Sequence, residues 1–293
     1  MTQPTGPWSG GGSVRELGLG DHLCHLFGDD DDLLSVAAEA VSGGLDRRHR
    51  ILIFAHRWGP EQFDYELKEL VPGWPAAVSS GQVEVQRSVD AYLPNGKFDP
   101  DARLQALLRS SSGARDSGYE GLRVVAEMGW AAAPTTGVEL VYSYEAWINP
   151  VVAAEPIAVV CLYDRRLFDL GQLSQASAVH PISTGQAALR CRCPDDGCLV
   201  LTGQVDATNH GALGSFIAPV VDREQPVTID ATELFFADVS AARLLVTTAV
   251  ARLGERTVID CVEPLTSLLR SMAGGNVPSL VIRDKTPREA RGA

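Results

Sequence analysis

The chain has 293 residues, which at about 150 residues per domain suggests two compact units. Its 25 Lys and Arg residues stand against 37 Asp and Glu residues, and the net charge of -12 disfavours nucleic acid and membrane surfaces as partners. Apolar residues make up 45% and charged residues 21%, a composition typical of folded proteins and not of disordered ones.

The first 17 residues are predicted to be a flexible leader, because they lack the basic start and the apolar block of an export signal. No apolar run reaches the roughly 18 residues of a membrane span, and Glu155 and Pro156 interrupt the best candidate. We therefore expect a cytoplasmic protein. Its six cysteines should then stay reduced.

An α/β domain is predicted for residues 18–183. A short strand pattern at 22–27 is followed by three unbroken apolar runs, which alternate with helical patterns. Unbroken runs are typical of parallel strands that are buried on both faces of a sheet. The three runs lie at 51–55, 122–128 and 157–163.

The loop after the first strand holds Gly28 and four aspartates, Asp29 to Asp32. In nucleotide-binding α/β proteins this loop cradles phosphate with backbone amides and a lysine. Four carboxylates here would occupy the helix N-terminus themselves and repel a triphosphate. A capped, solvated helix start is the simplest interpretation, and a divalent cation site is the alternative.

Polar side chains are predicted to gather at the carboxyl ends of the parallel strands, where open α/β sheets build ligand sites. Strand alternation also places the soft ligands His22 and Cys24 on one face. They fit a packed pair, a metal site, or a small-ligand or redox pocket, but no further ligands stand at zinc spacing, so no metal is predicted. The other candidates are Glu127, Trp130, Tyr163 and Asp164 near strand ends, joined by Tyr144, Glu145 and His180.

A second domain is predicted for residues 186–285, followed by a flexible tail at 286–293. Strand patterns at 188–193 and 198–203 flank a Pro-Asp-Asp-Gly turn that suits an antiparallel hairpin, and shorter strands and helices follow. Asp238 can cap an amphipathic helix, which places Ser240 in its first turn. A phosphate on Ser240 would add about two negative charges to that surface.

The motifs of the first domain resemble the MEDS domain, a sensory domain of bacterial and archaeal regulators. The resemblance implies a RecA-like fold that lacks a phosphate loop and senses small hydrocarbon-type molecules. It also implies that the nine candidate residues named above contact the ligand. The matching segments are GDHLCHLF (20–27), YLPNGKFDP (92–100), GYEGLRVVAEMGW (118–130), YEAWIN (144–149), CLYDRRLFD (161–169) and His180-Pro181.

The second domain is similar to STAS domains, which occur in anti-sigma factor antagonists. The segment GQVD (203–206) matches an early turn of that family, and Asp238 precedes Ser240 as an aspartate precedes the family's phosphorylatable serine. The resemblance implies phosphorylation at Ser240 and partner binding through Asp206, Asp238 and Ser240.

The sequence thus predicts an α/β chain, with a RecA-like parallel-sheet domain followed by a smaller STAS-like mixed-sheet domain. We expect a bacterial signalling regulator that senses a small molecule or redox state and binds an anti-sigma factor or a switch-type serine kinase. No catalysis is expected, the cofactor is unknown, and self-association stays open. The alternative is an enzyme or a metal-binding protein that uses His22, Cys24 and Glu127.

Overall fold

The computed structural model describes residues 13–185, 187–195, 198–221, 224–252, 254–274 and 277–285, apart from the side chains at 194, 195 and 219. These residues form two compact units. The first holds 13–141, 151–173 and 182–185, and the second holds 142–150, 174–181 and the described residues from 187 onward. Residues 1–12 of the predicted leader, the tail at 286–293, and Asp196 and Gly197 of the predicted turn lie outside the described residues.

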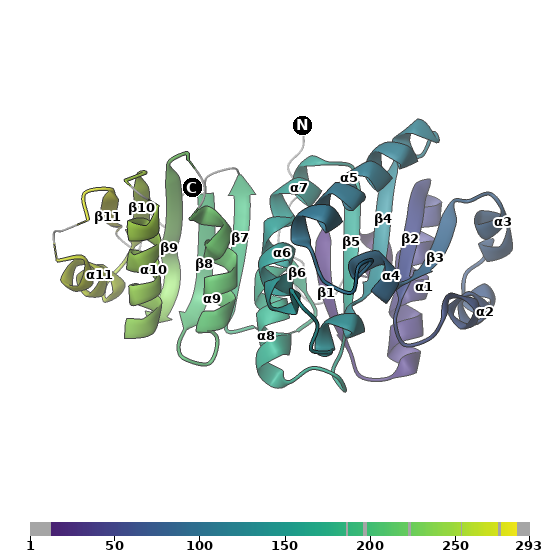
Figure 1. Ribbon diagram of the computed structural model, residues 1–293, viewed down its shortest axis with the longest axis horizontal. Helices are drawn as coiled ribbons and strands as arrows, with labels where there is room; N and C mark the ends of the chain where they lie inside the picture. The colour runs from purple at the N-terminus through teal and green to yellow at the C-terminus, as the bar shows by residue number, and fades with distance from the viewer. Residues whose placement is uncertain are drawn as a thin grey trace. The chain divides into compact units, whose positions relative to one another are not determined.

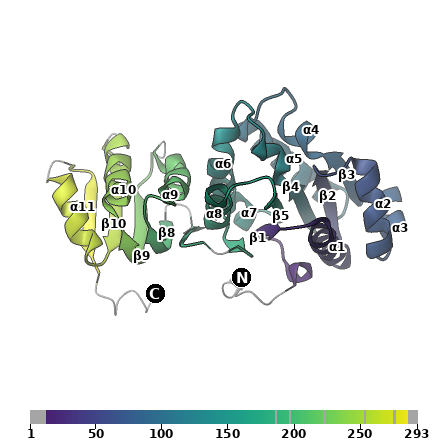
Figure 2. The ribbon, with the colours of Figure 1, turned by 90° about the horizontal axis from the view of Figure 1, so that it is seen from below.

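The first unit is built on a six-stranded sheet in the order β3-β2-β4-β5-β1-β6, in which every neighbouring pair is parallel (Figure 1). Helices α1 and α5 cover opposite faces (Figure 2), so every residue of β4 and β5 is buried. The predicted parallel α/β fold is confirmed. The strands are β1 (His22–Phe27), β2 (His49–Ala55), β3 (Val83–Arg87), β4 (Gly121–Glu127), β5 (Ile157–Asp164) and β6 (Ile182–Ser183).

Helices connect these parallel strands, as crossover connections require. The α-helices are α1 (Asp30–Asp46), α2 (Pro60–Leu70), α3 (Trp74–Ser79), α4 (Ser88–Tyr92), α5 (Pro100–Asp116), α6 (Val141–Trp147), α7 (Asn149–Ala154) and α8 (Leu170–Val179). Short 3-10 helices are η1 (Val14–Glu16), η2 (Met128–Ala132) and η3 (Val138–Leu140).

The second unit has a five-stranded sheet in the order β11-β10-β9-β8-β7. The hairpin pair β7–β8 is antiparallel and the other pairs are parallel, which confirms the predicted mixed sheet. Helices α9, α10 and α11 pack on one face (Figure 1). The elements are β7 (Leu189–Asp195), β8 (Cys198–Val205), α9 (His210–Ile217), η4 (Ala218–Val220), β9 (Val227–Ala237), α10 (Val239–Ala251), β10 (Thr257–Cys261), α11 (Leu265–Ala273) and β11 (Leu280–Asp284).

Each unit has its own apolar core. Leu23, Ile53 and Val125 are buried against α1 in the first unit, and Leu201 and Ile229 are buried under the helices of the second. Among the helices that the structure describes, none has the length and hydropathy that crossing a bilayer requires.

A close backbone contact fixes η1 against α1. At Gly43, in the C-terminal half of α1, an added Cβ atom would lie 2.2 Å from the carbonyl oxygen of Arg15. The side chain of Arg15 also binds Asp46 near the end of α1, with 2.7 Å between Nη2 and Oδ2. The absence of a side chain at Gly43 therefore allows residues 13–17 to pack on the domain.

We expect Gly43→Ala to destabilise the protein, although alanine is usually favoured over glycine inside a helix by about 1 kcal/mol. The new methyl group would collide with backbone atoms, so the free energy of unfolding should fall by about 1–3 kcal/mol in a urea titration. Gly28→Ala is the matched control, because no heavy atom lies within 4 Å of a Cβ built there. A stabilising effect of Gly43→Ala would contradict this contact.

Candidate ligand-binding site

The carboxyl ends of β1, β2, β4 and β5 meet at one edge of the first sheet and enclose a cavity of about 230 Å³. This is the edge at which open parallel sheets bind ligands. The volume is below the range that is common for drug-sized ligands, which favours a small molecule. The lining residues are Phe27, His56, Arg57, Glu127, Gly129, Asp164, Arg166 and Leu167.

Glu127, the last residue of β4, is the most unusual group in this cavity. Its side chain is buried, with 3% exposure. The backbone N–H of Arg57 donates to Oε2 at 2.8 Å, whereas Oε1 has no hydrogen-bond partner among the described residues. Burial raises the pKa of Glu127 from 4.5 to about 7, against the opposing backbone hydrogen bonds of Arg57 and His56. The carboxyl group can therefore change its charge near neutral pH.

A network of ion pairs surrounds the cavity mouth. Arg166 donates to Oδ1 of Asp164 through Nε and to Oδ2 through Nη2, both at 2.8 Å, and Nη2 also donates to Asp30 at 2.8 Å. The Nε atom of Arg57 lies 3.4 Å from the same Asp30. The hydrogen bond from Arg166 lowers the pKa of Asp30 below its usual value. The positive charges of these two guanidinium groups thus offset the negative charges of the two carboxylates.

His56 forms one wall of the cavity, and its ring can occupy this position because the neighbouring Gly129 has no side chain. A Cβ atom at Gly129 would lie 2.2 Å from Cδ2 of the His56 ring. The Nδ1 atom of His56 lies 3.3 Å from Oγ of Ser88. Burial is the main cause that lowers the pKa of His56, so the ring is neutral at neutral pH.

Glu127 and Asp164 are the predicted site residues that line this cavity. Trp130 packs instead in an aromatic cluster, where its ring centroid lies 4.7 Å from that of Tyr92 and 5.0 Å from that of Phe98. Tyr163 is fully buried, and its ring lies 5.2 Å from the ring of Phe168.

The predicted soft-ligand pair lies within the first sheet. His22 and Cys24 are both buried on β1, and the Nε2 atom of His22 lies 3.5 Å from Sγ of Cys161 on β5. Cys24 is the register partner of Cys161 in the parallel pairing of the two strands. Neither His22 nor Cys24 is among the lining residues of the strand-end cavity.

The remaining candidates of the first predicted domain belong to the second compact unit. The Oε2 atom of Glu145, on α6, lies 3.4 Å from Nε2 of His180, and both side chains are buried. The Nδ1 atom of His180 donates to the carbonyl oxygen of Ala176 at 2.7 Å. Tyr144 precedes Glu145 on the same helix and is also buried. This acid and imidazole therefore form a local pair.

The basic residues of the cavity, His56, Arg57 and Arg166, were not among the residues predicted from the sequence. His56 and Arg57 directly follow β2, and Arg166 stands two residues after β5. Their positions immediately after predicted parallel strands were the available signal, because such residues lie at the same edge as Glu127.

Of the predicted partner-binding residues, Asp238 and Ser240 lie at the start of α10, and Asp206 directly follows β8. The side chain of Asp238 caps this helix by accepting from N of Ala241 at 2.9 Å, and Oγ of Ser240 donates to Asp238 at 2.6 Å. Ser240 is exposed. Hydrogen bonds from Thr208 lower the pKa of Asp206. Two phenylalanines near the end of β9, Phe235 and Phe236, are also exposed.

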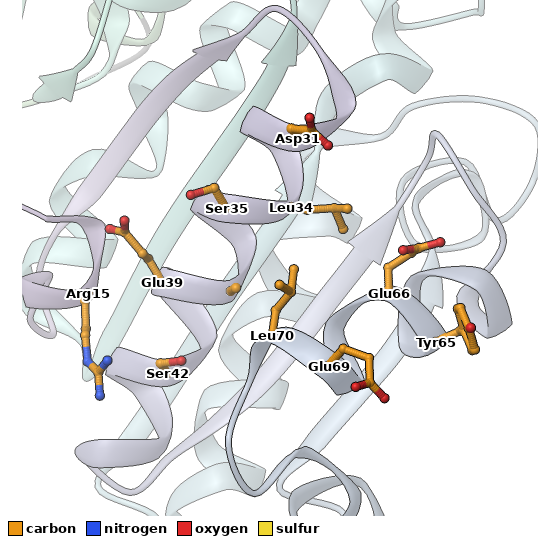
Figure 3. Close-up of a pocket in the computed structure, with 11 residues that line it drawn as sticks. Arg15, Asp31, Leu34, Ser35, Glu39, Ser42, Tyr65, Glu66, Glu69 and Leu70 are labelled. Carbon is orange, nitrogen blue, oxygen red and sulfur yellow. The ribbon is translucent and has the colours of Figure 1, made fainter.

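A larger, open groove of about 550 Å³ lies between α1 and α2 (Figure 3). Leu34 and Leu70 face each other across it, and acidic side chains such as Glu39 and Glu69 stand along its sides. None of the buried polar atoms that lack a partner belongs to its described lining residues. The smaller strand-end cavity is therefore the more specific candidate, because it holds such an atom on Glu127.

A family model described as MEDS, the methanogen/methylotroph, DcmR sensory domain, matches residues 21–181, which is more than half of the chain. The chain belongs to the MEDS family. The predicted resemblance of the first domain is thereby confirmed. The STAS resemblance of residues 186–285 stays a prediction.

Two individual proteins are similar to this MEDS chain. The transcriptional repressor DcmR of Methylorubrum extorquens (strain DSM 6343 / CIP 106787 / DM4) is 25% identical over 166 residues, which are 56% of this chain and 60% of the repressor. The chain thus spans 60% of the length of that relative. The flagellar accessory protein FlaH from Methanocaldococcus jannaschii aligns at 10% identity with a TM-score of 0.38, covering 67% of this chain and 82% of FlaH.

We expect Glu127→Gln to stabilise the MEDS chain at high pH only. Because the folded state binds the Glu127 proton more tightly than the unfolded state, wild-type stability falls as the pH rises from 4.5 to about 7. Glutamine carries no charge, so at about pH 8 it should raise the free energy of unfolding by up to about 3 kcal/mol and at about pH 5 by much less.

Urea titrations of both proteins at the two pH values measure this difference. Glu120→Gln is the control, because Glu120 is exposed just before the same strand. A Glu127→Gln effect of equal size at both pH values would show that the carboxyl group does not titrate as the structure indicates.

Proposed function

We propose that this protein is a signalling regulator whose strand-end cavity binds a small molecule and whose second unit binds a protein partner. The observation that carries the proposal is the buried carboxyl group of Glu127, which lines the cavity of a domain from a sensory family and whose Oε1 atom has no partner among the described residues. A buried carboxyl oxygen without a hydrogen bond is costly. A ligand that contacts it would recover that energy, and binding would be coupled to the stability of the site.

The start of α1 supports a ligand other than a nucleotide triphosphate. Asp29 caps the helix by accepting from N of Asp32 at 2.9 Å, and Asp30 is paired with Arg166 and Arg57. The chain's own carboxylates therefore occupy the position at which a phosphate loop would hold a phosphate.

Binding without catalysis fits the cavity better than the enzyme alternative. Neither Cys24 nor any serine or threonine is among the described lining residues, so no thiol or hydroxyl nucleophile stands in the lining beside Glu127. Arg166 is paired with Asp164, and the backbone N–H of Arg57 with Oε2 of Glu127, whereas Oε1 of Glu127 has no partner among the described residues. Such a lining favours recognition of a ligand over its chemical conversion.

A role in transcription regulation is supported by the relative whose name is transcriptional repressor DcmR. That likeness covers 56% of this chain and 60% of the repressor. We propose that this chain passes on its signal through its second unit. In this proposal the second unit is STAS-like and binds an anti-sigma factor or a switch-type serine kinase.

The surface around α10 supports the proposed docking role. Phe235 and Phe236 are 73% and 50% exposed, and Val239 is 61% exposed beside Ser240. Exposed aromatic and aliphatic side chains favour protein contact. A phosphate on Ser240 would stand next to the carboxylate of Asp238, which now accepts the Ser240 hydroxyl. Repulsion and added charge would then weaken docking.

We expect Ser240→Asp to reduce partner recovery several-fold and Ser240→Ala to leave it nearly unchanged. The measurement is a pull-down from a lysate of the source bacterium with the purified full chain, followed by quantitative mass spectrometry. Ser267→Asp is the matched control, because Ser267 is an exposed serine near the start of α11 in the same unit. Equal recovery of an anti-sigma factor or kinase by all variants, or recovery of neither, would contradict the proposed switch.

A further inference from the structure

Glu127 is the lining carboxylate that has no ion-pair partner among the described residues. Arg166 binds both Asp164 and Asp30, and Arg57 lies beside Asp30, so both lining guanidinium groups contact other carboxylates. Glu127 accepts backbone hydrogen bonds from Arg57, on Oε2, and from His56. When it is ionised, its buried charge therefore has no cation in direct contact among the described residues.

The remainder of the cavity is suited to a small apolar group. Phe27 is buried with 1% exposure, and the half-exposed Leu167 lies at the mouth. Gly129 leaves the wall without a side chain, and the close His56 ring would not permit one. The volume of about 230 Å³ limits the occupant to about ten non-hydrogen atoms, since a cavity of about 150 Å³ already holds benzene.

We propose that the cavity binds a small alkylammonium ion, whose N–H group donates to Oε1 of Glu127 and whose alkyl group contacts Phe27 and Leu167. The proposal rests on the proposed ligand-binding function and names the chemical class of the ligand. An ammonium ion provides the hydrogen bond that Oε1 lacks and a cation in direct contact with the ionised carboxylate. A neutral hydrogen-bond acceptor would require Glu127 to stay protonated, and an anion would be repelled by ionised Glu127 and Asp164.

An ammonium ion and a neutral hydrogen-bond acceptor predict opposite pH dependences of binding. Ammonium binding needs ionised Glu127, so it should weaken by about tenfold for each pH unit below about 7. The other charged or titratable groups that face Glu127 are His56, Asp30 and Asp164, whose pKa values lie below their ordinary values, and the guanidinium groups of Arg57, Arg87 and Arg166.

The test is isothermal titration calorimetry of the full chain with methylammonium chloride at several pH values between about 6 and 8. Sodium chloride controls for the anion, and tetramethylammonium chloride carries the charge without an N–H donor. Acetone is a neutral acceptor of similar size. We expect binding of methylammonium that strengthens with pH, and at least about tenfold weaker binding of the other three probes.

Two variants locate the binding. Glu127→Gln should weaken methylammonium binding by at least about tenfold, whereas Glu120→Gln should bind like wild type. Leu167→Trp fills the mouth without changing Glu127, and it should also weaken binding, which keeps the test valid if Glu127→Gln folds poorly. Circular dichroism establishes that each variant is folded.

Three outcomes overturn the inference: no binding of methylammonium, equal binding by Glu127→Gln, or binding that strengthens as the pH falls. If acetone binds and requires Leu167 and Glu127, the ligand-binding function stands and only the ammonium class fails. If no probe binds, the ammonium inference fails, and the partner pull-down with Ser240 variants remains the separate test of the regulatory function.

Discussion

The buried carboxyl group of Glu127 is the constraint on which the proposed site depends. It stands at the end of a strand that is buried along its whole length, so the sheet that holds the domain together also fixes its position. Only one of its two oxygens has a partner among the described residues. The domain retains a group that costs stability when ionised, and such a cost is typical of functional sites rather than of structural ones.

The ion pairs at the cavity mouth explain why Glu127, unlike Asp164, has no ion-pair partner among the described residues. Asp164 and Arg166 form a bidentate pair within two residues of each other, and Asp30 joins them from the start of α1. These contacts hold the N-terminus of α1 beside the end of β5 without a phosphate. The acidic loop thereby acquires a structural role, and Glu127 remains the lining carboxylate without an ion-pair partner among the described residues.

Parallel strands were predictable because their apolar runs are unbroken, and the placement of Glu127 and Asp164 at one edge followed from that topology. The pairing of Arg166 with both aspartates was not predictable, because exposed arginines follow many strands and sequence does not indicate which carboxylate they reach. Trp130 stands three residues after Glu127, yet a 3-10 turn directs it into an aromatic cluster with Tyr92. Local periodicity carries no information on such a change of direction.

The protonation of Glu127 links the structure of the site to its proposed role, and it can be measured directly. A ¹³C NMR titration of glutamate carboxyl groups in the full chain, with the Glu127 signal assigned by its loss in Glu127→Gln, reports the pKa of this side chain. The structure predicts a midpoint of about 7, which should fall when methylammonium is added. A midpoint near the ordinary value of 4.5 would show that Glu127 is solvated or paired, and it would contradict the account of the cavity.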